Sequence, residues 1–217
     1  MLIVLEGLDA CGKNTQSKRL VERLTHTGHE AVLYSFHRYD TELGTAIKRH
    51  LLNETMMAQV DMGHTQHTRA PEDAMVFQAM ATIDKYDAAA EIEDHIHAGR
   101  FVVCDRWTQS ALAFGWADGL SVEWLHRIQA RLPKADLNIL LEIAPEEAQR
   151  RRPVLRDRYE KDRTKQALVA TNYEALWRDS VGRAAWSRWV KVDGNGTIDV
   201  VGDRIWAQVV DRAGWPQ

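Results

Sequence analysis

The stretch from Leu2 to Gln16, which reads LIVLEGLDACGKNTQ, constrains the fold of this chain more than any other. Its first residues form a short apolar run, which is typical of a strand buried on both faces. Gly7 and Gly12 bound the next loop, which leads to Lys13 and then to a long helical pattern. A strand, a glycine-bounded loop and a helix are the context of a phosphate-binding P-loop. An ordinary strand–turn–helix corner is the alternative, and the Gly-Lys pair at this spacing disfavours it.

This motif binds phosphate through the backbone of the loop and the start of the helix. Glycines allow successive backbone N–H groups to point at one anion, and the helix adds unpaired N–H groups and the positive end of its dipole. Lys13 supplies a mobile positive charge for the β- and γ-phosphates of a nucleotide. We therefore expect ATP to bind at this loop. The residues expected to contact it are Gly7, Ala10, Cys11, Gly12, Lys13, Asn14 and Thr15.

Asn14 departs from the P-loop pattern. A Ser or Thr hydroxyl normally follows the lysine and holds Mg²⁺, whereas this chain has an amide. An amide oxygen can bind a hard cation directly or through water. Thr15 stands about 100° further around the helix, so it does not simply replace the hydroxyl. We expect nucleotide binding with an unusual metal shell.

Length and composition indicate one α/β domain over residues 1–217, because 45% of the residues are hydrophobic and 27% are charged. The net charge of −3 provides no basic field that would recruit nucleic acid. Cys11 and Cys104 are the two cysteines, which is no disulfide framework and fits a reducing compartment. No apolar run approaches the ~18 residues of a membrane span, and the first strand begins without a charged leader. We expect a cytoplasmic protein with no membrane partner.

Apolar strands alternate with helical patterns along the rest of the chain. Further strands are expected at residues 31–36, 101–104, 137–143 and 189–192, and helices at 17–28, 42–52, 72–97, 121–131, from 145, 163–178 and 198–211. Residues 53–71 are polar and look like an excursion or a loop. This alternation predicts an α/β fold, in which a parallel sheet lies between two layers of helices. Ligands then bind at the carboxyl ends of the strands.

Asp105 and Arg106 stand at that edge, directly after the apolar run at residues 101–104. In P-loop enzymes a carboxylate at such a strand end holds Mg²⁺, often through water. A turn or helix cap is the alternative for Asp105, and the nearby P-loop favours the metal site. Arg106 favours phosphate, because a guanidinium pairs with two phosphate oxygens at once.

Five arginines fall within nine positions after the fourth strand: Arg150, Arg151, Arg152, Arg156 and Arg158. A solvated helix face, a localisation signal and a nucleic-acid patch are the alternatives. Acidic residues interleave with the end of the cluster, which weakens the nucleic-acid alternative. In P-loop kinases a mobile arginine-bearing segment closes over the phosphates and excludes water. We favour such a short lid over residues 145–162.

The chain resembles the thymidylate kinase family, whose members make dTDP from dTMP and ATP. The resemblance is carried by the stretches GLDACGKNTQ, SFHRYDT, CDRWTQSALAF, LPKADL and RDRYEKD, in that order. It implies a three-layer α/β/α P-loop kinase fold with a five-stranded parallel sheet. It also implies ATP-dependent phosphorylation of dTMP with Mg²⁺-ATP as the donor, and a homodimer.

The resemblance also implies roles for individual residues. Asp9 faces the acceptor sugar and phosphate near the metal, Lys13 binds the donor phosphates, and Arg106 lies between the two phosphates. Arg38 and Tyr39 hold the acceptor phosphate. The catalytic set is Asp9, Lys13, Arg106, Arg152 and Arg156. The substrate-binding set is Asp9, Phe36, Arg38, Tyr39, Lys85, Arg106, Ser110, Ala111, Phe114 and Tyr159. The metal ligands are Asp9, Asp105 and, as a weak ligand, Asn14.

Four positions depart from the family pattern. His37 replaces a proline that is commonly preceded by a cis peptide bond, and such a bond without proline costs about 2.5–4 kcal/mol, so we expect this loop to differ. Lys85 replaces an arginine that contacts thymine, and Ala81 replaces an aromatic residue. Ala111 replaces an asparagine that reads the base in some members. The phosphate-binding half is therefore better matched than the base-reading half.

Two alternatives to a dTMP kinase stay open. One is a kinase for another or a modified pyrimidine deoxynucleoside monophosphate, such as dUMP or a 5-substituted dUMP, because Lys85 and Ala111 alter the base-reading half. The other is a non-catalytic nucleotide-binding module, because Asn14 replaces the hydroxyl that normally holds the metal.

Overall fold

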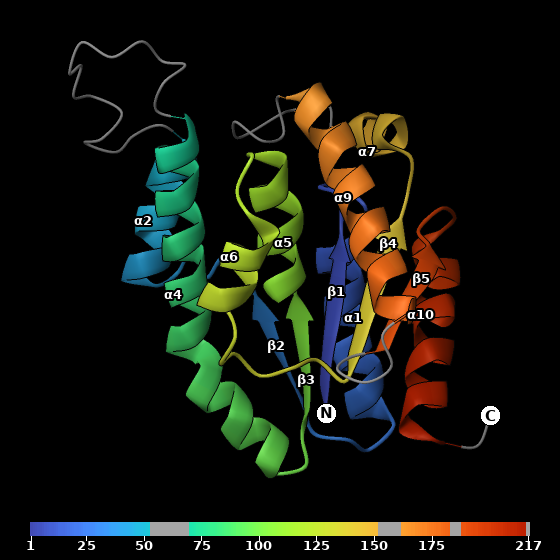
Figure 1. The fold of residues 1–217 in the computed structure, drawn as a ribbon. Coiled ribbons are helices and arrows are strands. Elements are labelled where there is room, and N and C mark those ends of the chain that lie inside the picture. Colours follow the sequence, from blue (N-terminus) through green and yellow to red (C-terminus); the bar gives the residue numbers. More distant parts are fainter. Residues whose placement is uncertain (53–69, 152–161, 183–187, 216–217) are drawn as a thin grey trace, which may run out of the picture.

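The computed structural model describes residues 1–52, 70–151, 162–182 and 188–215. Its centre is a five-stranded sheet in the order β2-β3-β1-β4-β5 (Figure 1). Each neighbouring pair of strands runs parallel, as the sequence predicts. The strands are β1 (Leu2–Gly7), β2 (Ala31–Ser35), β3 (Phe101–Asp105), β4 (Leu137–Glu142) and β5 (Arg188–Asp193).

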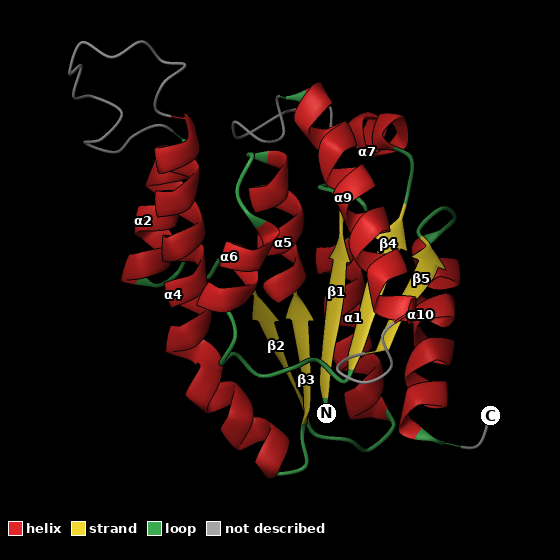
Figure 2. Ribbon diagram, viewed as in Figure 1, coloured by secondary structure: helices red, strands yellow, loops and turns green. Residues whose placement is uncertain are grey.

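Helices cover both faces of this sheet, which explains why the central strands are apolar along their length. The helices α1 (Lys13–His26) and α10 (Ile198–Ala213) lie on one face, and α5 (Thr108–Ala117) and α9 (Arg163–Gly182) lie on the other (Figure 2). The remaining helices are α2 (Glu42–Leu51), α4 (Ala70–His97), α6 (Val122–Ile128) and α7 (Pro145–Arg151). The predicted three-layer architecture is confirmed. In the described ranges, no helix has the length and apolar character needed to cross a membrane.

The register of the strands brings three distant segments together. Leu5 on β1 pairs with Asp105 on β3, and Ser35 on β2 pairs with the same residue. The backbone N–H of Arg106 donates to the carbonyl oxygen of Leu5 at 3.0 Å, and that of Phe36 donates to the carbonyl oxygen of Asp105 at 3.0 Å. The P-loop and the segments after β2 and β3 therefore meet at the carboxyl edge of the sheet.

The helix α5 is absent from the elements expected from the sequence. Its residues from Ala111 to Gly115 are all buried, because the helix packs against α4, α6, α9 and the sheet. A helix covered on all sides lacks the one-sided apolar pattern by which helices are recognised. Residues 53–69 of the expected excursion and residues 152–161 of the expected lid lie outside the described residues.

Gly7, at the end of β1, lies in close contact with β4 at the carboxyl edge of the sheet, and a substitution there can test this contact. Its φ is +139°, and a Cβ there would lie 2.6 Å from the carbonyl oxygen of Leu141 on β4. Gly28 has a φ of +88° and open space around it, so it is a matched control for backbone strain alone. We expect Gly28→Ala to lower the free energy of unfolding by about 1–2 kcal/mol, and Gly7→Ala to lower it by more. Urea unfolding followed by circular dichroism compares them, and equal losses would contradict the close contact with β4.

Candidate active site

The loop between β1 and α1 has the backbone of an anion-binding site. Gly7, Ala10 and Gly12 have φ values of +139°, +62° and +103°, so the chain turns through conformations that favour glycine. α1 begins at Lys13, and among the described residues no side chain caps it and no acidic residue occupies its first turn. The first N–H groups of the helix therefore lack intrahelical partners and can bind an anion.

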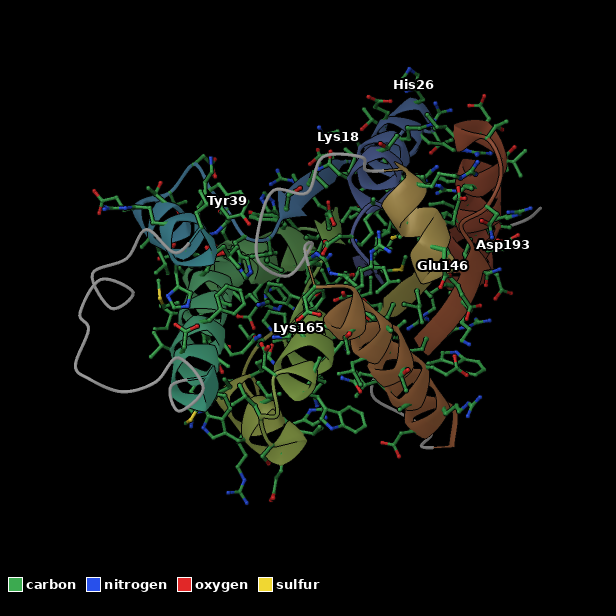
Figure 3. All side chains as sticks on the ribbon, turned by 90° about the horizontal axis from the view of Figure 1, so that it is seen from above. Lys18, His26, Tyr39, Glu146, Lys165 and Asp193 are labelled. Atoms are coloured by element: carbon green, nitrogen blue, oxygen red, sulfur yellow. The ribbon has the colours of Figure 1, made fainter. Side chains whose placement is uncertain are left out.

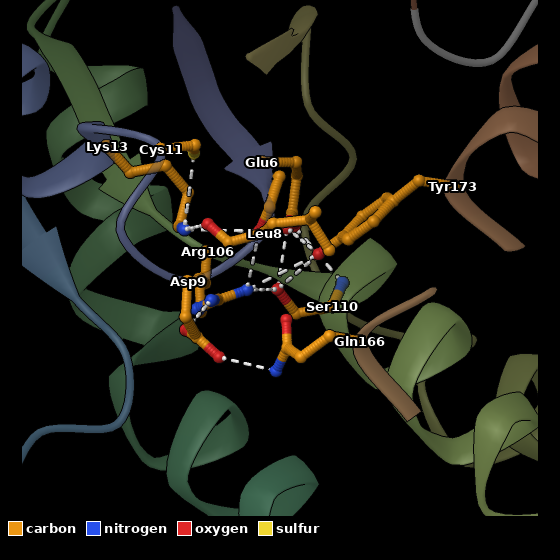
Figure 4. Close-up of polar contacts among 10 residues, drawn as sticks. Glu6, Leu8, Asp9, Cys11, Lys13, Arg106, Ser110, Gln166 and Tyr173 are labelled. Atoms are coloured by element: carbon orange, nitrogen blue, oxygen red, sulfur yellow. Dashed lines mark hydrogen bonds and ion pairs between the residues drawn. The ribbon is translucent and has the colours of Figure 1, made fainter. Parts of the chain in front are cut away.

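Lys13 folds back over this loop (Figure 4). Its Nζ donates to the carbonyl oxygens of Leu8 at 2.7 Å and Gly7 at 3.1 Å, and it lies 3.6 Å from Cys11 Sγ. The side chain is buried, so backbone carbonyl dipoles stabilise its charge. Nζ can exchange these dipoles for phosphate oxygens without breaking an ion pair.

Arg106 joins the P-loop to β3. It has a φ of +69°, and its guanidinium forms an ion pair with Asp9. The same guanidinium donates to the carbonyl oxygen of Gly7 at 3.2 Å and to Ser110 Oγ at 3.1 Å (Figure 4). Burial by itself lowers the pKa of Arg106, but Asp9 and nearby acidic groups raise it above its usual value. Burial by itself raises the pKa of Asp9, but Arg106 and Lys13 lower it, so both members of the pair are charged at neutral pH.

Glu6, which no motif of the sequence marks, orients Arg106. Its buried carboxylate accepts hydrogen bonds from the backbone N–H groups of Trp107 (2.9 Å) and Ser110 (3.2 Å). It also accepts from Ser110 Oγ at 2.6 Å and from Tyr173 OH at 2.9 Å. Both hydroxyls contact the guanidinium of Arg106 in turn. The signal in the sequence is an acidic residue that ends the apolar run of β1, because a buried carboxylate requires several donors.

Arg38, after β2, is held by two carboxylates of α4. Its Nε donates to Asp84 Oδ1 at 2.8 Å, and a terminal nitrogen donates to Asp87 Oδ2 at 2.7 Å. Its backbone is fixed by Gly44 on α2, where a Cβ would lie 1.7 Å from the carbonyl oxygen of Arg38. Burial by itself lowers the pKa of Arg38, but the two carboxylates raise it. Arg38 is therefore charged and already paired, and no pattern in the sequence marks its partners.

A cleft opens to solvent between these charged groups and the helices α4 and α5, and its empty space, open mouth included, is about 590 Å³. Figure 3 looks onto this edge, with Tyr39 on the α2 side and Glu146 on the α7 side. The cleft brings together most of the residues expected to bind substrate: Asp9, Phe36, Tyr39, Lys85, Arg106, Ser110, Ala111 and Phe114. Its lining is completed by His37, Leu51, Phe77, Gln78, Ala81 and Trp107. The guanidinium of Arg38 lies 6.0 Å from the ring centroid of Phe36.

Lys85 is buried and His37 is partly buried, and both line the cleft. Lys85 Nζ donates to the carbonyl oxygen of Ala81 at 3.0 Å and lies 6.0 Å from the ring centroid of Phe36. Burial lowers the pKa of Lys85 to about 8 and that of His37 to about 4, so His37 is neutral at pH 7. The Phe36–His37 peptide bond is cis. The expectation that the loop differs here for want of a proline is therefore wrong.

The expected metal ligands, Asp9, Asp105 and Asn14, lie on three different segments. No cluster of three or more His, Cys, Asp or Glu side chains suited to a metal occurs in the part of the chain that the structure describes. Asp9 is occupied by Arg106 and by Gln166 Nε2, at 3.2 Å from Asp9 Oδ2. Asp105 is 9% exposed at the end of β3, and Asn14 is exposed on the first turn of α1. This oxygen donor set fits a Mg²⁺ ion whose remaining ligands are water and phosphate oxygens.

The arginine cluster is only partly described. Arg150 and Arg151 lie on α7 and form ion pairs with Glu147, with N–O distances of 2.6 Å for Arg150 and 2.8 Å for Arg151. Arg152, Arg156 and Tyr159 lie outside the described residues, so their roles stay predictions.

Comparison with known proteins finds one family over most of the chain. The family model described as thymidylate kinase matches residues 5–205. Thymidylate kinase from Caenorhabditis elegans is 31% identical over 210 residues, which cover 93% of this chain and 86% of the relative. A probable thymidylate kinase from Pyrococcus horikoshii is 35% identical over 153 residues, or 69% of this chain and 68% of the relative. The solved structure of thymidylate kinase from Candida albicans aligns with a TM-score of 0.76 over 98% of this chain and 92% of that one, at 24% identity.

Lys85 should make the stability of the protein depend on pH. Because its pKa is lowered from 10.5 to about 8, the unfolded chain binds more protons between these values, and the free energy of unfolding rises with pH in that window. Lys85→Met removes this rise, and at pH 7 it removes the penalty of a buried ammonium group. We expect the variant to unfold at a higher urea concentration than the wild type at pH 7. Urea titrations from pH 7 to pH 10 measure both effects, and parallel pH curves for the two proteins would contradict a buried, titrating Lys85.

Proposed function

The chain belongs to the thymidylate kinase family of nucleoside-monophosphate kinases, and from this premise we propose that it transfers the γ-phosphoryl group of ATP to dTMP. The observation that carries the proposal is the position of Arg106. Its guanidinium contacts Asp9 and Gly7 of the P-loop, and it also lies 5.1 Å from the ring centroid of Phe114 in the cleft. One cation is thus within reach of both a phosphate at the P-loop and a nucleotide in the cleft.

In this proposal the P-loop binds the donor phosphates. The N–H groups at the start of α1 hold them, and Lys13 Nζ exchanges its contacts with Gly7 and Leu8 for phosphate oxygens. The exchange replaces two dipole contacts by contacts between opposite charges, which favours the bound nucleotide.

A magnesium ion would be held by Asp105, with Asp9 and Asn14 as further oxygen ligands. When bound, the ion supplies positive charge to the donor phosphates. Asn14 is exposed on the first turn of α1, so its amide oxygen is accessible to a hydrated ion.

Transfer requires a positioned acceptor rather than a general base. The acceptor phosphate is ionised at neutral pH, so one of its oxygens forms the new P–O bond while the bond from the γ-phosphorus to the bridging oxygen breaks and ADP leaves. Arg106 is fixed by Asp9, Ser110 and Tyr173, and it supplies positive charge between the two phosphates. Because the guanidinium is oriented before the substrates bind, little ordering remains for the transfer step.

Arg38 and Tyr39 bind the acceptor phosphate, once the guanidinium has loosened its pairs with Asp84 and Asp87. Phe114 lies below the sugar, where an aromatic ring offers no partner to a ribose 2′-hydroxyl. Burying that hydroxyl unpaired costs about 1–3 kcal/mol, so deoxyribose should be preferred by roughly ten- to hundred-fold.

A kinase for dUMP or a 5-substituted dUMP is the second candidate. Lys85 keeps a positive donor beside the base but lacks the planar fork of an arginine. Ala81 and Ala111 are buried and small, which leaves room at the edge of the base. These residues support relaxed discrimination between dTMP and its close analogues.

We also propose a homodimer, as the family resemblance implies. Met75, Ile83 and Tyr86 are 42%, 55% and 37% exposed and fall on one side of α4. An exposed apolar stripe of this kind is suited to packing against a second copy of the chain, and sedimentation equilibrium measures the resulting mass.

An assay with ATP and a panel of nucleoside monophosphates tests the proposed function. We expect transfer to dTMP, and to dUMP with comparable kcat/KM, because both offer a single ring and a deoxyribose. Purine monophosphates should react slowly, because the cleft between Phe36 and α4 is sized for one ring. A preference for a purine would contradict the pyrimidine site. ATP binding without transfer to any monophosphate would identify a non-catalytic module.

Two lysines of α1 give this assay a test variant, at Lys13, and a matched control, at Lys18. Lys13→Met should lower kcat/KM by about 10³-fold or more, because a phosphate clamp is lost from the transition state. Lys18 lies exposed on the same helix (Figure 3), so Lys18→Met should keep its activity. Wild-type turnover in Lys13→Met would rule out the proposed mechanism.

A separate prediction concerns Asn14 and the Mg²⁺ concentration that activity requires. If the amide is a poorer Mg²⁺ ligand than a hydroxyl, Asn14→Ser should reach half-maximal activity at a lower Mg²⁺ concentration than the wild type. Titration of activity against Mg²⁺ at saturating ATP measures the difference. An unchanged or higher requirement in the variant would show that other ligands already complete the shell.

A further inference from the structure

The face of α4 that borders the cleft carries four residues at helical spacing: Phe77, Gln78, Ala81 and Lys85. Residues three or four positions apart lie on the same side of a helix, so these side chains share the surface along which a base would lie. Gln78 has no role in the transfer described above. It is 1% exposed, and its Nε2 has no hydrogen-bond partner among the described residues.

This unpartnered amide is held in place beside the cleft. A Cβ on Gly115 of α5 would lie 3.3 Å from Gln78 Cγ, so the stem of Gln78 packs closely against that helix. The hydrogen bond from Thr82 Oγ1 at 2.7 Å goes to the backbone carbonyl of Gln78 and does not involve Nε2 of its side chain. A buried N–H group without a partner is unfavourable, because it has lost its hydrogen bonds to water. A ligand that brings an acceptor into the cleft would remove this penalty.

Lys85 provides a second donor on the same face. Its Nζ uses one N–H on the carbonyl oxygen of Ala81 at 3.0 Å, and an ammonium group has three. Ala81 stands between Gln78 and Lys85 on the helix and carries only a methyl group, so its side chain does not fill the space between the two donors. The α4 face of the cleft therefore presents N–H donors at two positions about two turns apart.

We propose that Gln78 is a specificity-determining residue that, together with Lys85, selects pyrimidines with carbonyl groups at C2 and C4. The proposal rests on the proposed kinase function and assigns a base preference to the same cleft. Uracil and thymine offer carbonyl oxygens to the amide of Gln78. Cytosine carries an N–H₂ group at C4, so a donor would face a donor and the amide would stay unpaired. Gln78 makes no distinction between uracil and thymine, because the two bases share both carbonyls.

The test compares wild type, Gln78→Met and Gln78→Glu with dTMP, dUMP and dCMP. For each pair, kcat/KM is measured in the transfer assay and Kd by isothermal titration calorimetry. Methionine keeps the length of the side chain and removes the amide, whereas glutamate replaces the donor by acceptors. Gln129→Met is the matched control, because Gln129 is 5% exposed, has an unpartnered Oε1 within the described chain, and stands at the end of α6 away from the cleft lining.

We expect Gln78→Met to lower kcat/KM for dTMP and dUMP about 3- to 10-fold through a higher KM, with a smaller effect on dCMP. The ratio of dTMP to dCMP then falls by a similar factor. Gln78→Glu should move the ratio further toward dCMP, because its carboxylate accepts from the amino group of cytosine. The KM for ATP in all variants, and the base ratio in Gln129→Met, should match the wild type.

A base ratio that is unchanged in both Gln78 variants would overturn the inference, even if the wild type is an active kinase. Equal losses for all three monophosphates would also overturn it, because they indicate a role in packing alone. If the wild type binds dTMP without phosphorylating it, the proposed function fails, and the ratio of Kd values still decides the role of Gln78. If the wild type binds none of the three, both proposals fall.

Discussion

The ion pair between Arg106 and Asp9 is the contact on which the rest of the candidate site depends. It joins the P-loop to the end of β3, and it can form because the parallel register brings the ends of β1 and β3 to the same edge. Glu6 sets the direction of the guanidinium through Ser110 and Tyr173, whose hydroxyls contact both charged groups. A buried network of this kind is rigid when each member is satisfied. Removal of one partner would leave a partly buried charge uncompensated, which is more unfavourable than loss of a surface pair.

The cations of this site have partners before any phosphate arrives, and the partners differ in strength. Lys13 is held by backbone carbonyls, and so is Lys85. Arg38 and Arg106 are held by carboxylates. A phosphate competes easily with a carbonyl dipole and less easily with a carboxylate, because the latter carries a full charge. In the proposed function, the donor phosphates would therefore recruit Lys13 at little cost, whereas the acceptor phosphate would have to share Arg38 with α4. Binding at the acceptor side would then be the more demanding of the two steps.

The phosphate-binding side could be predicted from the sequence because its signals are contiguous. Gly7, Gly12 and Lys13 fall in one short stretch of sequence, from the end of β1 to the start of α1. Strand ends follow from apolar runs, so the sheet and the ligand-binding edge could be predicted without a structure. Glu6 and Tyr173 stand 167 residues apart in the chain, and no local pattern reports that they meet. The helix α5 was not predicted for a different reason. Its residues are buried around the whole helix, so its sequence lacks the alternation of apolar and polar residues that marks an amphipathic helix. The roles expected for the lid residues stay predictions, because residues 152–161 lie outside the described part of the chain.

The base-reading side obeys a different constraint, which explains why the family resemblance is weaker there. The groups that handle phosphate are fixed to backbone turns and strand ends, so a change at Gly7 or Arg106 would disturb the edge of the sheet itself. The residues that would face a base in the proposed function stand on α4 and α5, where Ala81, Lys85 and Ala111 border an open cleft. A smaller or differently charged side chain at these positions alters the space and the donors offered to a ligand while leaving the helices in place. Membership of the family therefore indicates that this chain is a phosphoryl-transferring enzyme. Its preference for one base over another depends instead on the side chains that α4 and α5 present to the cleft.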